Sequence, residues 1–256
     1  MRLLALGDVC GEVGMDILRR QLRPLIKWQK ADLVVCNGEN ADVLGIRPQQ
    51  AEELLNLGVD VLTLGNHTWH RREITRMLDD EPRIIRPANF APHLPGTGLA
   101  MVITPGGRRL GVISLIGRLN CDWSADNPFS AADRLLAEGK ADLYIVDFHA
   151  ETSSEKKAMG YYLDGRVSAV FGTHTHIQTA DERILPGGTG CISDLGMCGA
   201  ANSILGIKID QALNVFLGGL PERFACAPGP GRIEGALFEI DESSGRCLLT
   251  ERIAVE

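Results

Sequence analysis

Two histidines stand one residue apart in the stretch FGTHTH, at positions 174 and 176 of a chain with only six histidines. Residues i and i+2 of an extended chain point to the same side, so this spacing suits a metal site. It suits a polar strand end equally well, and the pair alone leaves both interpretations open. The chemistry therefore depends on which other polar residues the fold brings to His174 and His176.

Polar residues with metal-binding or acid–base chemistry also follow four other apolar stretches. The full set is Asp8, Glu39, Asn40, Asn66, His67, His149, His174 and His176. Each one alone has an ordinary explanation, such as a turn residue, a helix N-cap or a hydrogen-bonded core histidine. Together they are hard to explain by turn chemistry, because all of them come after segments that resemble buried strands.

The donor types of this set narrow the chemistry. Carboxylate, amide oxygen and imidazole, without a thiolate, suit Mn, Fe or a similar ion better than a structural zinc site. The set is larger than one ion needs, whereas two ions that share a bridging carboxylate would use it well. Two ions about 3.5–4 Å apart can activate a bridging hydroxide and hold a phosphate for in-line displacement. The residues therefore favour a two-metal site for phosphoryl chemistry.

The elements that must position these residues alternate between apolar strands and helices. Strands are predicted at 2–6, 32–36, 59–64, 141–148 and 167–172, and helices up to about residue 30 and at 47–58, 71–79 and 153–163. Pro48 near the start and Gly58 at the end are typical of a helix. Loops at the carboxyl ends of strands in an open α/β sheet converge on one crevice. We therefore expect five strands to deliver the polar residues to one edge of the sheet.

Apolar segments around Gly-rich turns predict antiparallel hairpins in addition to the parallel strands. They cover 99–117, 182–194 and 234–253. No repeat or linker interrupts the chain, so we expect one domain over 1–256. The segment 117–131, with Asn120, Trp123 and Asn127, is expected to lack regular structure and to form a rim or lid over the site.

Composition excludes several classes of protein. The 256 residues are 45% hydrophobic and 23% charged, as in a globular protein with a sizeable core. No apolar run approaches the ~20 residues of a membrane span, and the first one ends too early for a signal peptide. The net charge of −7 argues against broad binding to nucleic acid or anionic membrane. Seven cysteines without C-x-x-C spacing suit a reduced, cytoplasmic protein.

Six short motifs occur along the chain in the order GDVCGEVG, NGENAD, LGNHTWH, DFHAETSSEK, GTHTHIQTAD and SDLGMCG. In this order and spacing they resemble the YmdB-like branch of the calcineurin-like metallophosphoesterases, over the chain from Leu3 to about Ile253. The resemblance implies an αββα four-layer sandwich, in which two facing mixed sheets are flanked by helices. It also implies a two-metal phosphodiesterase that hydrolyses cyclic nucleotides, with 2′,3′-cyclic AMP the favoured substrate.

The resemblance further implies a role for each polar residue. The first metal would be bound by Asp8, Asn40 and His176, and the second by Asn66, His149 and His174. Glu39 would bridge the two ions, for which Fe or Mn is expected. His67 would stay off the metals and act as general acid toward the leaving oxygen. The motif GMCG at 196–199 has no expected role beyond lining the site.

Two departures from the wider superfamily agree with this branch. The sequence Asp8-Val9-Cys10 replaces the usual Asp-x-His, and we expect Asn40 rather than Cys10 to supply the missing ligand. The bridging aspartate of the wider superfamily is a glutamate here, Glu39.

Two alternative functions stay open at this stage. The chain could bind metals and a nucleotide as a regulatory protein with little turnover, or act as a phosphomonoesterase or nuclease on the same metal centre. The expected partner is a small phosphodiester substrate, with neither a stable nucleic-acid complex nor a membrane. A homo-oligomer is left open.

Overall fold

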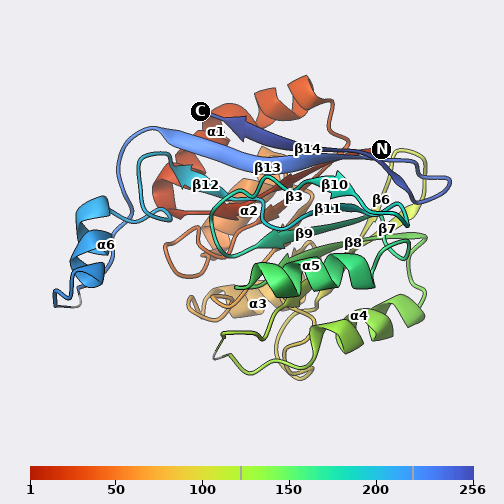
Figure 1. Ribbon diagram of the computed structural model, residues 1–256, viewed down its shortest axis with the longest axis horizontal. Helices are drawn as coiled ribbons and strands as arrows, with labels where there is room; N and C mark the ends of the chain where they lie inside the picture. Colours follow the sequence, from red (N-terminus) through yellow and green to blue (C-terminus); the bar gives the residue numbers. More distant parts are fainter. Residues whose placement is uncertain (122, 221) are drawn as a thin grey trace.

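The computed structural model describes residues 1–121, 123–220 and 222–256. Their strands form two mixed sheets that lie face to face (Figure 1). The first sheet contains β1 (Arg2–Leu6), β2 (Asp8–Val9), β3 (Leu33–Asn37), β4 (Val61–Thr63), β5 (Ile84–Ile85), β12 (Met197–Ala200), β13 (Gly231–Ile240) and β14 (Cys247–Val255). Its strand order is β2-β12-β13-β1-β3-β4-β5, and β14 pairs with β13.

The second sheet has the order β10-β11-β9-β8-β7-β6. Its strands are β6 (Leu99–Ile103), β7 (Arg109–Ile116), β8 (Leu143–His149), β9 (Ala169–Thr173), β10 (Arg183–Ile184) and β11 (Gly190–Ile192). The helices are α1 (Gly11–Gln29), α2 (Pro48–Leu57), α3 (Ile74–Asp80), α4 (Pro128–Ala137), α5 (Ser153–Tyr162) and α6 (Ile209–Phe216). None of the helices in the described part of the chain has the length and apolar character that a membrane crossing requires.

Alternation along the strands builds the layers, because successive side chains of a strand point to opposite faces. Leu4 of β1 packs in a core with α1, α2 and α3, whereas the next residue, Ala5, lies in the core between the two sheets. Phe171 of β9 and Phe238 of β13 meet in that inner core with ring centroids 5.9 Å apart. On the outer face of the second sheet, Phe148 packs in a core with α4 and α5.

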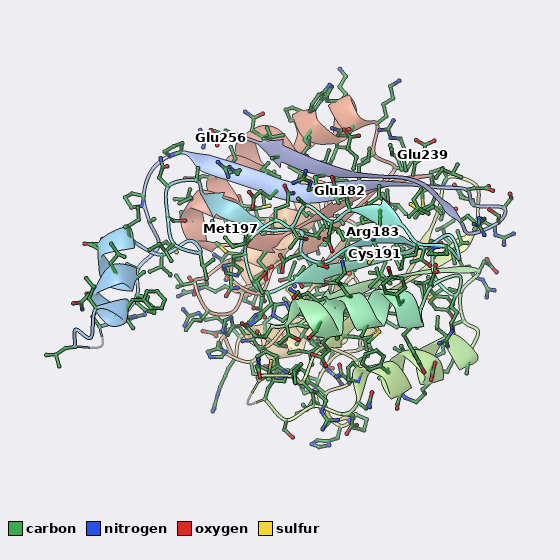
Figure 2. The ribbon with its side chains drawn as sticks, in the orientation of Figure 1. Glu182, Arg183, Cys191, Met197, Glu239 and Glu256 are labelled. Atoms are coloured by element: carbon green, nitrogen blue, oxygen red, sulfur yellow. The ribbon has the colours of Figure 1, made fainter. Side chains whose placement is uncertain are left out.

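The fold prediction of two facing mixed sheets flanked by helices is confirmed. The helix predicted over 47–58 is α2, and Gly58 caps it with φ 117°. The three predicted hairpins are β6–β7, β10–β11 and β13–β14, and all three pair antiparallel. The second hairpin packs against the third, and Glu182 and Arg183 lie beside the β13–β14 pair in Figure 2. Arg252 of β14 donates from Nε to Glu182 at 2.8 Å.

Three features of the fold differ from the sequence predictions. The five site-bearing strands do not share one sheet: β1, β3 and β4 belong to the first, and β8 and β9 to the second. The segment 117–131 was predicted to lack regular structure, but α4 begins within it at Pro128. Residue 122 of this segment lies outside the described part of the chain. Strand β12 and helix α6 were not anticipated, and α6 projects from the body of the molecule (Figure 1).

Candidate metal centre

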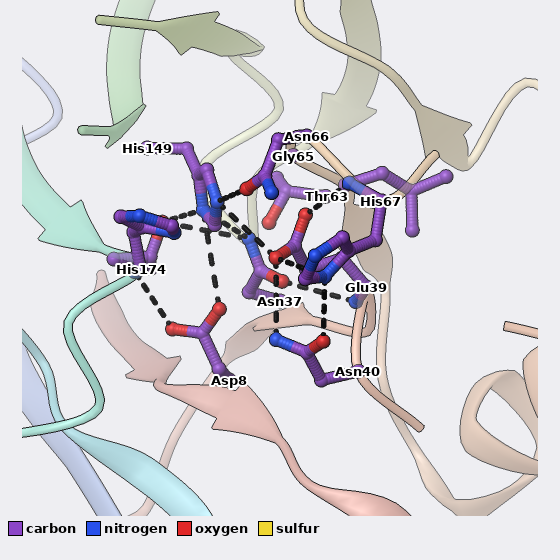
Figure 3. A network of polar contacts seen from close by, with 12 residues as sticks. Asp8, Asn37, Glu39, Asn40, Thr63, Gly65, Asn66, His67, His149 and His174 are labelled. Carbon is purple, nitrogen blue, oxygen red and sulfur yellow. Dashed lines mark hydrogen bonds and ion pairs between the residues drawn. The ribbon is translucent and has the colours of Figure 1, made fainter. Parts of the chain in front are cut away.

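The site lies where the carboxyl ends of parallel strands from both sheets meet (Figure 3). The first sheet supplies residues that follow β1, β3 and β4, and the second supplies residues that end or follow β8 and β9. Contacts of 4 Å or less connect the whole predicted set, which is Asp8, Glu39, Asn40, Asn66, His67, His149, His174 and His176. The structure therefore brings all eight predicted residues together, although from two sheets rather than one.

Glu39 is the centre of this arrangement, and its side chain is fully buried. A turn after β3 aims it inward, because the Asn37 side-chain oxygen accepts the Glu39 backbone N–H at 3.1 Å. Glu39 Oε1 lies 3.2 Å from His149 Nε2 on one side and 3.2 Å from His67 Nδ1 on the other. The carboxylate thus joins the two sheets and contacts residues from three strand ends.

The two histidines of the THTH stretch lie in different groups around Glu39. Ligand atoms of Glu39, His149 and His174 come within 4.8 Å of one another. His176 instead places Nε2 3.1 Å from Asn40 Nδ2 and 3.9 Å from Asp8 Oδ1. This grouping agrees with the expectation that His174 and His176 bind different ions. The ligand roles themselves stay predictions.

Asp8 connects the group that contains His176 with the group that contains His149 and His174. The Asp8 carboxylate accepts the His174 backbone N–H at 3.0 Å and lies 3.9 Å from His149 Nδ1. Asn66 completes the opposite side, where its side-chain oxygen lies 2.8 Å from His149 Nε2. Asp8 and Asn66 therefore bracket the buried imidazole of His149.

Hydrogen bonds behind His149 fix which ring nitrogen faces the site. Thr173 donates its hydroxyl proton to Asp147 at 2.7 Å, so its oxygen accepts from His149 Nδ1 at 2.9 Å. His149 therefore faces Glu39 and Asn66 with Nε2, the nitrogen at which a metal ion would replace a proton. His176 is held in the same way, because Nδ1 donates to the Leu205 carbonyl at 3.1 Å.

Asp147 was missed by the sequence prediction, although a signal existed. It is a fully buried carboxylate in the otherwise apolar strand β8, and Thr63 and Asn37 also hydrogen-bond to it. Burial raises the pKa of the Asp147 carboxyl, and these hydrogen bonds oppose the rise. A charged residue in an apolar strand directly before His149 is typical of a group that orients a ligand.

The buried charges show that this donor set fits a cation. Burial raises the pKa of Asp8 to about 6, and its Oδ1 is buried without a hydrogen-bond partner among the described residues. A Cβ on Gly65 would come within 2.3 Å of Glu39 Oε2 and 2.4 Å of His149 Nε2, so a side chain there would fill the space between them. Unpaired buried carboxylate oxygens carry a large desolvation cost, which a bound divalent ion removes. The residues present therefore fit metal ions.

The protonation states around Glu39 are coupled. Burial would raise the pKa of Glu39, but His149 and His67 bring it well below its ordinary value. Burial would lower the pKa of His149, but Glu39 raises it to about 9. Burial, followed by the charge of His149, lowers the pKa of His174 to about 3. Metal bound at His149 Nε2 would take the place of its proton, because imidazole binds metal in the neutral form.

Cys10 lies beside His176, with its Sγ 3.5 Å from His176 Nδ1. Burial raises the pKa of the Cys10 thiol well above its ordinary value, which favours the neutral thiol over the thiolate. The expectation that Cys10 is not a ligand stays a prediction.

A buried ion pair holds the loop that carries His174 and His176. Lys156 Nζ lies 2.5 Å from Asp194 Oδ2, and both side chains are buried. The same carboxylate oxygen accepts the Thr175 backbone N–H at 3.2 Å and the Thr175 hydroxyl at 2.6 Å. His174 and His176 adopt φ of 99° and 61°, a backbone region that non-glycine residues rarely occupy. We infer that Asp194 holds this strained loop through Thr175.

The motif GMCG has a structural place next to Asp8. It leads into β12, whose first residue, Met197, is labelled in Figure 2. Met197 pairs in parallel register with Asp8. A Cβ on Gly7 would come 2.1 Å from the Gly196 carbonyl oxygen. The chain before β12 can therefore lie this close to residue 7 only because residue 7 is a glycine. The motif therefore fixes the backbone that carries Asp8.

The rim predicted at 117–131 divides into residues with different roles. Trp123 places its ring 5.6 Å from the His174 ring in an edge-on contact and donates from Nε1 to the Gly117 carbonyl at 2.6 Å. Asn127 is the N-cap of α4, where its side chain accepts from two backbone N–H groups. Among these residues, Trp123 is therefore the one for which a contact with a predicted ligand is seen.

The fold is of the metallophosphoesterase type, and comparisons with known proteins give the particular family. The family model described as YmdB-like protein matches residues 4–253. A 2′,3′-cyclic-nucleotide 2′-phosphodiesterase from Bacillus subtilis (strain 168) is 43% identical, across 100% of this chain and 97% of that protein. The chain therefore belongs to the YmdB-like family, and the resemblance seen in its motifs is confirmed.

Solved structures give the same result for the fold. A crystal structure of a hypothetical protein from Thermus thermophilus superposes with a TM-score of 0.93 at 40% identity, across 100% of this chain and 99% of that one. The crystal structure described as a novel phosphatase from Mycoplasma pneumoniae also gives 0.93, at 34% identity and across 100% and 93% of the two chains.

Glu39→Ala is expected to lose both metal ions, because a single carboxylate contacts both groups of candidate ligands. Glu39→Gln tests whether the charge itself is needed, since the amide keeps the shape. Metal content would be measured by mass spectrometry on purified protein, with the exposed Glu52→Ala as control. Two ions at normal occupancy in Glu39→Ala would rule out the bridging role.

Thr175→Val is expected to weaken metal affinity about 10–100-fold, because it removes the hydroxyl that ties the histidine loop to Asp194. Thr175→Ser keeps the hydroxyl and is expected to stay near the parent protein. Chelator competition would measure both affinities. Equal losses in the two variants, or unchanged affinity in Thr175→Val, would contradict the role of this hydrogen bond.

Proposed function

We propose that the protein is a metal-dependent phosphodiesterase that hydrolyses 2′,3′-cyclic nucleotides. The observation that carries the proposal is the arrangement around Glu39, which has two groups of candidate metal ligands and a separate imidazole, His67, beside it. The prediction that the chain is an enzyme of the phosphoesterase class is confirmed by its family. The name of the Bacillus subtilis relative supports 2′,3′-cyclic nucleotides as the substrate class.

The proposal assigns the donors to two ions, for which Fe or Mn is our choice. Asp8, Asn40 and His176 would hold one ion, Asn66, His149 and His174 the other, and Glu39 both. When bound, the ions supply Lewis-acid activation of water and neutralise charge that develops on the phosphate oxygens.

His67 has the position that a general acid needs. Its Nδ1 is 2.7 Å from Asn40 Oδ1, to which it donates, and its backbone N–H donates to Glu39 Oε2 at 3.0 Å. These bonds fix the ring, while Nε2 has no hydrogen-bond partner among the described residues and one fifth of the side chain is exposed. As water adds to phosphorus and the bond to the ribose 2′ oxygen breaks, His67 gives its Nε2 proton to that oxygen.

Asn40 has two tasks in this proposal. Its side-chain oxygen accepts from His67, while its Nδ2 lies 3.1 Å from His176 Nε2 and 3.2 Å from Glu39 Oε1. Asn40 thereby connects the acid to the metal-binding groups and sets the distance between them. An ion held by Asn40 and His176 would have to use the second lone pair of the Asn40 oxygen, because turning the amide would break the bond from His67.

Purified protein is expected to contain two ions for each chain and to hydrolyse 2′,3′-cyclic AMP to the 3′-monophosphate. Hydrolysis of 3′,5′-cyclic AMP and of nucleoside monophosphates is expected to be slower, because their leaving groups lie differently relative to His67. Chelator should remove activity, and Mn²⁺ should restore it. Tight nucleotide binding without turnover would favour a regulatory binding protein, and activity that survives chelation would rule out the metal-dependent reaction.

His67→Ala is expected to lower kcat for 2′,3′-cyclic AMP by roughly 10²–10⁴-fold, the usual contribution of a general acid. Metal content should stay near that of the parent protein. A diester with a 4-nitrophenolate leaving group should lose far less rate, because this group departs without protonation. The exposed His93→Ala serves as control. If the metals are lost together with activity, His67 is a ligand and the assigned role is wrong.

A further inference from the structure

A cavity of about 680 Å³ opens beside the candidate metal centre. His67, Asn40, His174 and His176 contribute to its lining, so it is continuous with the site. The rest of the lining comes from residues between 10 and 71 and between 205 and 226. The volume lies within the usual range of small-molecule sites. The described residues of 117–131 are not part of this lining.

Large apolar side chains in the lining remain half exposed. Leu44, Leu205 and Phe224 keep 44%, 43% and 44% of their surface accessible, although they come from loops far apart in the sequence. Apolar side chains that gather around one cavity while accessible to solvent are typical of a ligand site. Phe224 adds an aromatic face, on which a planar heterocycle can stack.

Backbone strain is concentrated at the same cavity. Six described residues other than glycine have positive φ, and four of them line the cavity. These are Val43 at 67°, His174 at 99°, His176 at 61° and Leu205 at 54°. Val43 is a β-branched residue, for which this conformation is especially costly. Strained backbone of this kind persists where the surrounding structure holds it, often at ligand sites.

The charged residues of the lining favour a polar or anionic ligand. Three arginines and one aspartate give the lining a formal charge of +2, in a chain with a net charge of −7. Asp42 holds two of the arginines, with Arg47 Nε at 2.7 Å and Arg71 also in contact. Arg223 has no ion pair with any described residue, so its guanidinium stays available to the cavity.

The proposed reaction places the nucleoside on the side of His67. The leaving oxygen belongs to the ribose, and the acid must lie within hydrogen-bond distance of it. His67 lines the cavity, and its Nε2 has no partner among the described residues. A nucleotide whose phosphate lies at the metal centre and whose 2′ oxygen lies at His67 therefore extends its ribose and base into the cavity.

We propose that this cavity is the binding site for the nucleoside part of the substrate, with the base against Phe224, Leu205 and Leu44. This inference rests on the proposed function. The site selects a cyclic phosphodiester that carries a planar base over one that lacks a base.

The test compares 2′,3′-cyclic AMP with glycerol 1,2-cyclic phosphate, which has the same five-membered cyclic diester and no base. The parent protein loaded with Mn²⁺ is expected to have a much higher kcat/KM for the nucleotide. Phe224→Ala should lower the ratio of the two kcat/KM values roughly tenfold, within the range of a lost base–aromatic stack. The change should come mainly from KM for the nucleotide, and Phe224→Tyr should keep the ratio.

Phe216→Ala is the matched control, because Phe216 lies on α6, is 81% exposed and does not line the cavity. Leu44→Ala is a second variant and should lower the same ratio if Phe224→Ala folds poorly. A parent protein that hydrolyses both substrates with equal kcat/KM, or a ratio unchanged by both cavity variants, would overturn the base site while the phosphodiesterase stands. A parent protein that hydrolyses neither substrate would overturn the proposed function, and the base site with it.

Discussion

The carboxylate of Glu39 is a charge buried where the ends of two sheets meet, and the rest of the site is arranged around it. An isolated carboxylate in such a place would cost many kcal/mol, so the surroundings must supply positive charge or hydrogen bonds. His149 and His67 do so from opposite sides, each 3.2 Å from Glu39 Oε1. Asp8 and Asp147 add two more buried carboxyl groups nearby, which makes bound cations the natural completion of the site.

This arrangement depends on two sheets. Parallel strands in one sheet place the ends of β1, β3 and β4 side by side, so they supply Asp8, Glu39 and Asn66 from one direction. The imidazoles of His149 and His174 arrive from the second sheet, across the inner core in which Phe171 meets Phe238. Packing between the sheets therefore sets the distance between carboxylates and imidazoles, and close-packed interiors hold such distances firmly.

Much of this could be predicted from local sequence. Apolar runs that stop at Asp8, Glu39 or His149 mark strand ends, and side chains at the ends of parallel strands converge whichever sheet they occupy. The division into two sheets could not be read from the runs, because a buried strand has the same apolar pattern in either sheet. The resemblance to a known family predicted two facing sheets, but not which strands belong to each.

The residues that hold the ligands were harder to predict than the ligands. Thr175, Asp194 and Lys156 lie far apart in the sequence, and their contact exists only after β9 and α5 have packed. The same is true of the apolar wall of the cavity, to which Leu44, Leu205 and Phe224 contribute from separate loops. A single Thr or Leu in a loop carries no sequence signal of such a contact. A histidine after an apolar strand, or an aspartate within one, does carry such a signal.

The central claim is that one buried glutamate joins two metal sites and that the two neighbouring histidines are divided between them. Anomalous diffraction from crystals of the Mn²⁺-loaded protein tests it directly. The account predicts two peaks with Glu39 between them, His174 at one peak and His176 at the other. A single peak, or two peaks with both histidines at the same one, would contradict it.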